Sequence, residues 1–182
     1  MAALERELRI DKIDDCVFVG SWAAATDEQN LEENDIKAVL SISENKKPPN
    51  VLDLYNKFGI LSYEIRIENV SNEDFYRWFP RMFAIINHFA MQKANILVHC
   101  SDGNCRAIVA ITAYEIIKAY LNPAPKKSPI CTMIMQKIQE LRDHVSVPTN
   151  FTQALQRLER EIREKKYDLS ELAKVLKLKY NA

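Results

Sequence analysis

The segment from Ile96 to Tyr120 constrains the fold of this chain more than any other part of its sequence. A short apolar run, Ile96 to Val98, leads into a polar stretch with a central glycine, and a second apolar run without glycine follows from Ala107. A short apolar run that ends in a turn is typical of a buried strand, and the longer run is typical of a buried helix. We therefore predict a strand, a tight loop and the start of a helix in direct succession.

The polar stretch carries residue types that suit phosphate chemistry. It reads His99-Cys100-Ser101-Asp102-Gly103-Asn104-Cys105-Arg106. Inward backbone N–H groups and a helix N-terminus create a positive concavity, which stabilises a thiolate at Cys100 and binds a phosphate dianion. Arg106 offers a planar fork of donors to two phosphate oxygens, and Gly103 permits a positive φ. We expect His99 to orient the loop, so that the thiolate can attack a bound phosphate.

This stretch matches the His-Cys-x5-Arg signature of cysteine-dependent phosphatases, and its flanks resemble the dual-specificity phosphatase family. The segment IDDCVFVGSWAAATDEQNLEENDIKAVLSISE, from Ile13, resembles that family's opening strand, helix and second strand. The segment VPTNFTQALQRLE, from Val147, resembles its closing loop and last core helix. The resemblance covers roughly residues 10–165. It implies hydrolysis of phosphotyrosine, and also of phosphoserine or phosphothreonine, through a phosphocysteine, with no metal and no cofactor.

The resemblance also implies the roles of individual residues. Cys100 is the nucleophile and Arg106 grips the phosphate. The residues expected to surround the bound phosphate are His99, Ser101, Asp102, Gly103, Asn104 and Cys105. A general acid must protonate the leaving oxygen, and the family has an aspartate on a loop after the third strand. Aligning the following helix places Glu68 at that position, while Asp74 and Asp102 remain alternatives.

The loop departs from the family at three positions. Ala107 stands where a serine or threonine usually helps the thiolate to leave, as in the phosphatases of regenerating liver, and this implies slow turnover. Asp102 replaces a small apolar residue, although CSDG also begins the myotubularin loop. Cys105 precedes Arg106 and is either a redox partner of Cys100 or, more commonly for such a residue, a passive small side chain.

These departures leave two other functions open. A pseudophosphatase would bind phosphoproteins without turnover, although it would not need the cysteine. A phosphoinositide or RNA 5′-phosphate phosphatase would favour extra cations, which the loop lacks. Lys46, Lys47, Lys126 and Lys127 are candidates for a basic rim.

Charge and cysteine content indicate the cellular setting. Acidic and basic residues balance to a net charge of zero, which argues against nucleic acid or a membrane surface as the partner. The opening residues MAALERELRI carry charges where a signal peptide is apolar, and no run reaches the roughly 18 apolar residues that span a bilayer. Four cysteines without framework spacing suggest a reducing compartment. We expect a cytoplasmic protein, with the nucleus also open and the oligomeric state undetermined.

The pattern of the whole chain predicts a single-domain α/β fold, with a central, mostly parallel, twisted sheet flanked by helices. Strands are expected at residues 17–19, 37–42, 61–67 and 96–99. Helices are expected at residues 23–34, 75–92 with a start or kink at Pro80, 107–121, 130–145 and 152–165. The catalytic domain is assigned to residues 1–166. Residues 167–182 form an amphipathic extension, which either packs on the domain or serves dimerisation or docking.

Overall fold

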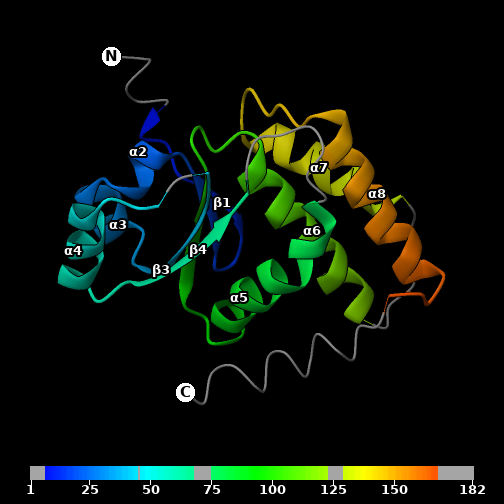
Figure 1. The fold of residues 1–182 in the computed structure, drawn as a ribbon, viewed down its shortest axis with the longest axis horizontal. Coiled ribbons are helices and arrows are strands. Elements are labelled where there is room, and N and C mark those ends of the chain that lie inside the picture. The colour runs from blue at the N-terminus through cyan, green and yellow to red at the C-terminus, as the bar shows by residue number, and fades with distance from the viewer. Residues whose placement is uncertain (1–6, 45, 68–74, 123–128, 168–182) are drawn as a thin grey trace.

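The computed structural model describes residues 7–44, 46–67, 75–122 and 129–167, and it is built around one five-stranded sheet (Figure 1). The strands follow the order β1 (Asp11–Asp14), β2 (Val17–Gly20), β5 (Asn95–His99), β3 (Ile36–Ser43) and β4 (Leu61–Arg66). Only the edge pair β1–β2 is antiparallel, and the other three pairs are parallel. The prediction of a mostly parallel sheet is confirmed.

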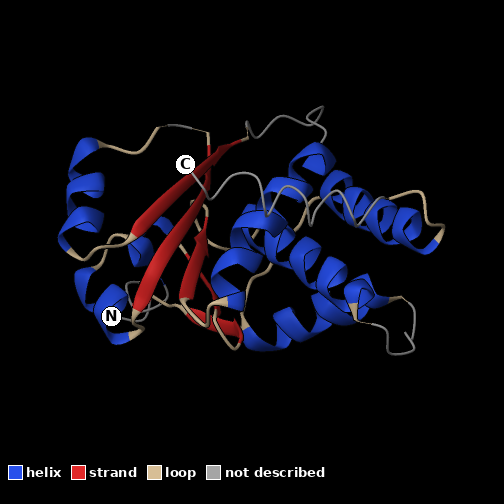
Figure 2. Ribbon diagram, turned by 90° about the horizontal axis from the view of Figure 1, so that it is seen from below, coloured by secondary structure: helices blue, strands red, loops and turns tan. Residues whose placement is uncertain are grey.

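Helices cover both faces of this sheet (Figure 2). One face carries three short helices, α2 (Trp22–Ala25), α3 (Glu28–Glu33) and α4 (Pro49–Lys57). The other carries the 3-10 turn η1 (Phe75–Trp78), α5 (Phe79–Met91), α6 (Arg106–Leu121), α7 (Ile130–Leu141) and α8 (Thr149–Arg163). The single-domain α/β architecture expected from the sequence is therefore confirmed.

The central strand β5 shows why the sheet needs helices on both sides. Its residues Ile96 and Val98 join the larger apolar core, which includes α5, α6 and α8, whereas Leu97 joins the smaller core beneath α3 and α4. A parallel strand that is buried on both faces reads as a continuous apolar run instead of an alternating one. The apolar run recognised in the sequence thus corresponds to the middle of the molecule.

Local capping corrects the expectation of one helix over residues 23–34. The chain forms α2 and α3 as separate helices because Thr26 ends the first and Asp27 caps the second. The carboxylate of Asp27 accepts the backbone N–H of Asn30 at 2.8 Å, which starts a new helix. A proline marks the start of a helix in the same way at α5. Pro80 lies in the first turn of α5, where a proline is favourable.

Other elements also differ from the expected ones. Helix α4 was not predicted, and it begins with Pro49 in its first turn. Helix α7 ends at Leu141 instead of residue 145, and α8 begins at Thr149 instead of residue 152. The expected C-terminal extension, residues 167–182, lies outside the described residues except for Tyr167.

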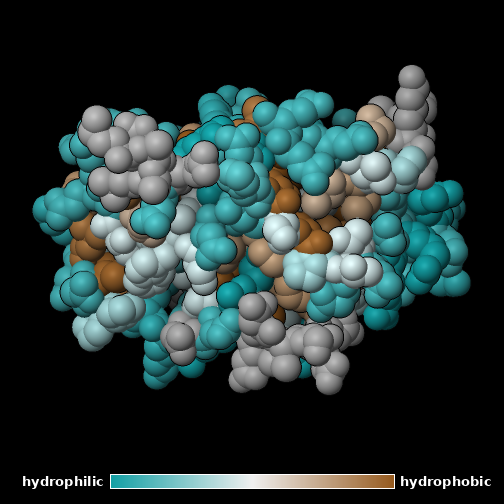
Figure 3. Space-filling view, turned by 90° about the horizontal axis from the view of Figure 1, so that it is seen from above, coloured by the Kyte–Doolittle hydropathy of each residue, from teal (hydrophilic) through white to brown (hydrophobic). Residues whose placement is uncertain are grey.

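The face of the molecule shown in Figure 3 is mainly hydrophilic over its described residues. The most exposed large apolar side chains are spread over five elements, with two of them on α7, namely Leu52, Leu61, Met91, Leu121, Met133 and Leu141. Scattered apolar side chains of this kind are normal for a folded protein. Among the described residues, no helix has the length and apolar character needed to cross a membrane.

Candidate active site

The segment from Cys100 to Arg106, called here the signature loop, joins the central strand to the most buried helix. Cys100 directly follows β5, and Arg106 is the first residue of α6. The expected succession of strand, loop and helix is therefore present. Ligands of open α/β sheets bind at the carboxyl ends of the strands, which is where this loop lies.

Each backbone carbonyl of residues 100–105 accepts a hydrogen bond. The carbonyl of Cys100 accepts from His99 Nδ1 at 3.2 Å, and the Ser101 carbonyl accepts from the Trp22 N–H at 2.9 Å. Arg142 donates to the next two, with Nη2 to Asp102 at 3.1 Å and Nε to Gly103 at 3.1 Å. The last two carbonyls, of Asn104 and Cys105, accept from the N–H groups of Ser146 at 2.9 Å and Val109 at 3.0 Å.

This pattern determines where the loop's N–H groups point. In a trans peptide the carbonyl of one residue and the N–H of the next face opposite ways. Six outward carbonyls, from Cys100 to Cys105, therefore turn the N–H groups of residues 101–106 toward the loop interior. None of the N–H groups of residues 101–105 donates to another described residue. Converging N–H groups at a helix N-terminus form an anion site.

Cys100 and Arg106 occupy the two ends of this cradle. The Cys100 side chain is buried, with 4% of its surface exposed, and the Arg106 side chain is buried at 7%. The Arg106 guanidinium donates from Nη1 to the Ile67 carbonyl at 3.2 Å, and its Nη2 lies 3.3 Å from Glu44 Oε1. Because the guanidinium is held from two sides, its remaining donors keep one orientation for a bound anion.

His99 supports the loop from beneath. Its ring is fully buried, and Nε2 lies 2.9 Å from the Ser41 hydroxyl while Nδ1 donates to the Cys100 carbonyl. A carbonyl can only accept, so Nδ1 carries the proton and Nε2 accepts from Ser41. Burial, opposed by the bond to Cys100 and reinforced by the charge of Lys47, lowers the pKa of His99 to about 4. His99 is thus a buried, neutral support of the loop.

Cys105 differs from Cys100 in its surroundings. All four cysteines are free, and Cys105 is half-buried. Burial, together with the nearby Cys100 and Asp102, raises the pKa of the Cys105 thiol to about 11, although Arg106 acts in the opposite direction. A thiol with this pKa is protonated at neutral pH and reacts slowly. The environment favours the interpretation of Cys105 as a passive side chain.

The three candidates for the general acid are placed differently. Glu68 and Asp74 lie outside the described residues, whereas Asp102 is exposed on the signature loop. Ile67, which directly precedes Glu68, is buried and contacts Arg106 through its carbonyl. The described chain thus reaches the site at Ile67, the residue before Glu68 in the sequence.

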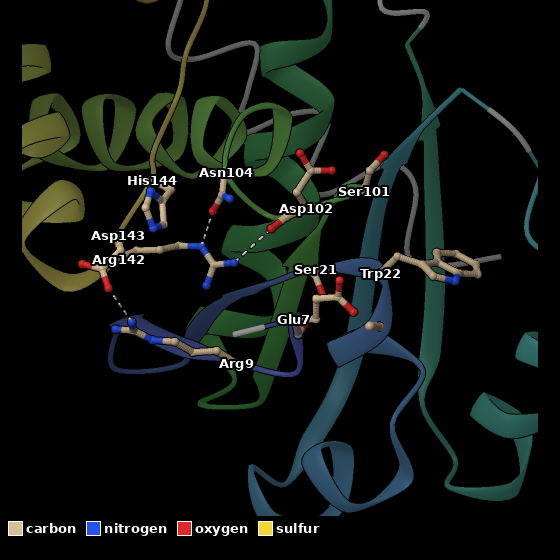
Figure 4. Close-up of a pocket in the computed structure, with 11 residues that line it drawn as sticks. Glu7, Arg9, Ser21, Trp22, Ser101, Asp102, Asn104, Arg142, Asp143 and His144 are labelled. Carbon is tan, nitrogen blue, oxygen red and sulfur yellow. Dashed lines mark hydrogen bonds and ion pairs between the residues drawn. The ribbon is translucent and has the colours of Figure 1, made fainter. Parts of the chain in front are cut away.

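A pocket of about 510 Å³ lies on the outer flank of the signature loop (Figure 4). Ser101, Asp102 and Asn104 form one wall, and Arg142 with its neighbours Asp143 and His144 forms another. Neither Cys100 nor Arg106 lines it. The pocket is therefore beside the anion cradle and is separated from it by the loop itself.

Several residues that contact the site were not identified from the sequence, and four of them illustrate the reason. Ser41 and Glu44 come from the end of β3 and the residue beyond it, Trp22 begins α2, and Arg142 follows α7. Each makes contact across a long separation in the chain, and none belongs to a local motif. Only the approach of β3 and α7 to the loop in the folded chain reveals their role.

Comparison with known proteins agrees with this geometry. The family model "Dual specificity phosphatase, catalytic domain" matches residues 17–161. A probable dual specificity protein phosphatase of Dictyostelium discoideum is 29% identical over 154 residues, which cover 84% of this chain and 65% of that protein. The chain thus spans somewhat less than two thirds of that relative.

Two solved structures share the fold. Human DUSP28 superimposes with a TM-score of 0.70 at 18% identity, covering 85% of this chain and 95% of that one. PTPMT1 in complex with PI(5)P superimposes with a TM-score of 0.68 at 14% identity, covering 87% and 99%. The family match contains β2, the signature loop and most of α8. On this evidence the chain belongs to the dual specificity phosphatase family.

Proposed function

We propose that this protein is a phosphatase that hydrolyses phosphotyrosine, and also phosphoserine or phosphothreonine, in protein substrates. The observation that carries the proposal is the set of six outward carbonyls, which turn the N–H groups of the loop inward as a cradle. Cys100 lies at one end of this cradle and Arg106 at the other. Such preorganised donors stabilise charge on a transferring phosphoryl group without reorganising during the reaction. The residues proposed to surround the phosphate are His99 and those of the signature loop.

The proposed reaction has two steps. The Cys100 thiolate attacks phosphorus, a phosphorus–sulfur bond forms, and the ester oxygen leaves with a proton from a carboxylic acid. Water then attacks the phosphocysteine, the carboxylate accepts a proton from it, and the thiolate is released with inorganic phosphate. Glu68 is the preferred acid because Ile67, immediately before it, contacts Arg106. Turnover is proposed to be slow because buried Ala107 supplies no hydroxyl in the first turn of α6.

Charge around the signature loop favours protein substrates over polyanionic ones. Residues 101–105 include no lysine or arginine. Lys47 donates to Ser62 Oγ at 2.5 Å and to the Tyr63 carbonyl at 3.0 Å, and burial lowers its pKa to about 8. Lys126 and Lys127 lie outside the described residues. We also propose that the protein acts in a reducing compartment such as the cytoplasm, since all four cysteines are free.

Hydrolysis of an aryl phosphate by wild type, Cys100→Ser and Cys16→Ser tests the proposal. Cys16 is half-buried and precedes β2, so its substitution controls for the loss of a thiol elsewhere. We expect Cys100→Ser to lose roughly a thousandfold or more in kcat/KM, because the nucleophile is gone. Equal rates for wild type and Cys100→Ser would contradict the proposal.

A substrate panel separates the alternatives. It compares phosphotyrosyl, phosphoseryl and phosphothreonyl peptides with PI(5)P and a 5′-triphosphate RNA. Release of phosphate from the peptides in preference to the others is the expected result. Peptide binding with no release would identify a pseudophosphatase, and preference for the lipid or the RNA would identify a phosphatase for polyanionic substrates.

A further inference from the structure

Arg142 is a buried charge that the reaction proposed above does not use. It follows α7, and only 5% of its surface is exposed. Burying a guanidinium costs free energy unless it is paired with an anion and its remaining N–H groups are satisfied. An arginine in this position therefore has a structural or functional reason that its contacts can reveal.

The contacts of Arg142 divide between one carboxylate and the signature loop. Nη1 lies 2.6 Å from Asp11 Oδ2, on strand β1. Nε donates to the Gly103 carbonyl and, at 2.9 Å, to Asn104 Oδ1, while Nη2 donates to the Asp102 carbonyl. Figure 4 shows the guanidinium lying against the outer side of the loop. Asp11 balances the charge, and the other donors turn loop carbonyls outward.

The fit between Arg142 and the loop leaves no spare room. Gly103 has a φ of +73°, and a Cβ placed there would lie 2.6 Å from Arg142 Nη2 and would also collide with the Gly20 carbonyl. The loop is thus held between the guanidinium and the end of β2. Lysine carries the same charge but lacks the planar fork, so it cannot donate to Asp11, Asp102 and Gly103 in this geometry.

We infer that Arg142, held by Asp11, is a positioning residue that keeps the N–H groups of the signature loop aimed at the thiolate and the phosphate. Its effect passes through two peptide groups, 102–103 and 103–104, whose carbonyls it binds on the side away from the cradle. This inference rests on the proposed function, because it assigns Arg142 a role in the same site. Arg142 touches neither Cys100 nor Arg106 in the described contacts, so it is not a catalytic residue.

The variant Arg142→Lys tests the inference, and Asp11→Asn tests the support of the guanidinium. The first readout is the rate at which iodoacetamide alkylates Cys100 at pH 6.5, located by fragment mass spectrometry. The second is the inhibition constant of orthovanadate. We expect alkylation to be about tenfold slower and orthovanadate to bind about tenfold more weakly in Arg142→Lys, because fewer N–H groups face the thiolate and the anion. The corresponding loss in kcat/KM is roughly a hundredfold.

Two controls separate positioning from general destabilisation. Arg9→Lys changes another arginine bound to Asp11, at 2.6 Å, but Arg9 donates to no loop residue. Leu158→Ala removes a buried side chain from α8, a helix that supplies none of the donors to the loop carbonyls. Both controls should keep the wild-type rate of alkylation and the wild-type binding of orthovanadate. Leu158→Ala is compared with Arg142→Lys at the same loss in Tm.

The outcomes distinguish this inference from the proposed function. If wild-type Cys100 is alkylated no faster than Cys16, the activated nucleophile is missing and the proposed function fails. If wild-type Cys100 reacts fast and Arg142→Lys leaves both readouts unchanged, the function stands and the role of Arg142 is refuted. Equal losses in Leu158→Ala and Arg142→Lys would also refute it, because the effect would then follow stability alone.

Discussion

Gly103 is the residue on which the shape of the signature loop depends most directly. Its φ of +73° lies in the left-handed region, and its missing Cβ leaves space for Arg142 and for the carbonyl of Gly20. Gly59 has a similar φ of +65°, but a Cβ there would meet no atom within 4 Å. The two glycines therefore share the same backbone requirement and differ only in steric crowding.

The substitution Gly103→Ala separates these two requirements. We expect a loss of roughly a hundredfold or more in kcat/KM for an aryl phosphate, because the loop must shift to relieve the collision. Gly59→Ala is the matched control, and it should cost only about 1 kcal/mol in the free energy of unfolding, with wild-type kcat/KM. Steady-state kinetics and urea unfolding measure both effects. Wild-type activity in Gly103→Ala would show that the loop tolerates the displacement.

At the scale of elements, α7 depends on a side chain from α8. Helix α7 begins after Pro129, which provides no side-chain cap. The buried carboxylate of Glu159 takes that place, accepting the N–H groups of Ile130 at 2.8 Å and Cys131 at 3.0 Å. A carboxylate at a helix N-terminus also interacts favourably with the helix dipole. Because Arg142 follows α7, this cap contributes to the placement of the site.

Removal of this cap should destabilise the fold measurably. Glu159→Ala leaves two buried N–H groups without their acceptor, and we expect the free energy of unfolding to fall by about 2 kcal/mol or more. Glu140→Ala, at an exposed position of α7, should change the free energy of unfolding by less than about 0.5 kcal/mol. Urea denaturation of both variants measures the difference. Similar small changes in the two would mean that the cap contributes little.

At the scale of the whole molecule, a buried neutral histidine links stability to pH. The pKa of His99 is lowered from 6.5 to about 4 by burial. The unfolded chain therefore binds a proton more readily than the folded one between these values. Stability should be fully present above pH 6.5 and should decline as the pH falls toward 4. Burial of Glu115 raises its pKa above 4.5, which acts in the opposite sense at the acid end of this range.

This linkage can be measured by urea unfolding at a series of pH values. We expect a loss of about 3 kcal/mol between pH 7 and pH 4 that is attributable to His99. His99→Gln should show a correspondingly flatter profile, although its stability at pH 7 is lower because Ser41 and the Cys100 carbonyl lose their partner. Parallel profiles for wild type and His99→Gln would contradict the assignment.

The chain's local patterns were sufficient to predict the centre of the fold. The apolar run of β5, the glycine of the loop and the long apolar stretch of α6 are all local signals. Short helices were predicted less well, because α2, α3 and α4 begin and end through single caps and prolines instead of long periodic stretches. Element boundaries depend on such individual contacts, which a repeating pattern does not record.

Sequence alone determined the chemistry of the candidate site, because a nucleophilic thiol, a glycine and a guanidinium must lie within one short loop to act together. Tertiary structure alone decided how that loop is held. The donors from Trp22, Arg142 and Ser146, and the carboxylates of Glu44 and Asp11, come from distant segments. Their contact depends on the positions of β1 and β3 within the sheet and on the packing of α7 against it. No local pattern in the chain encodes which side chains meet there.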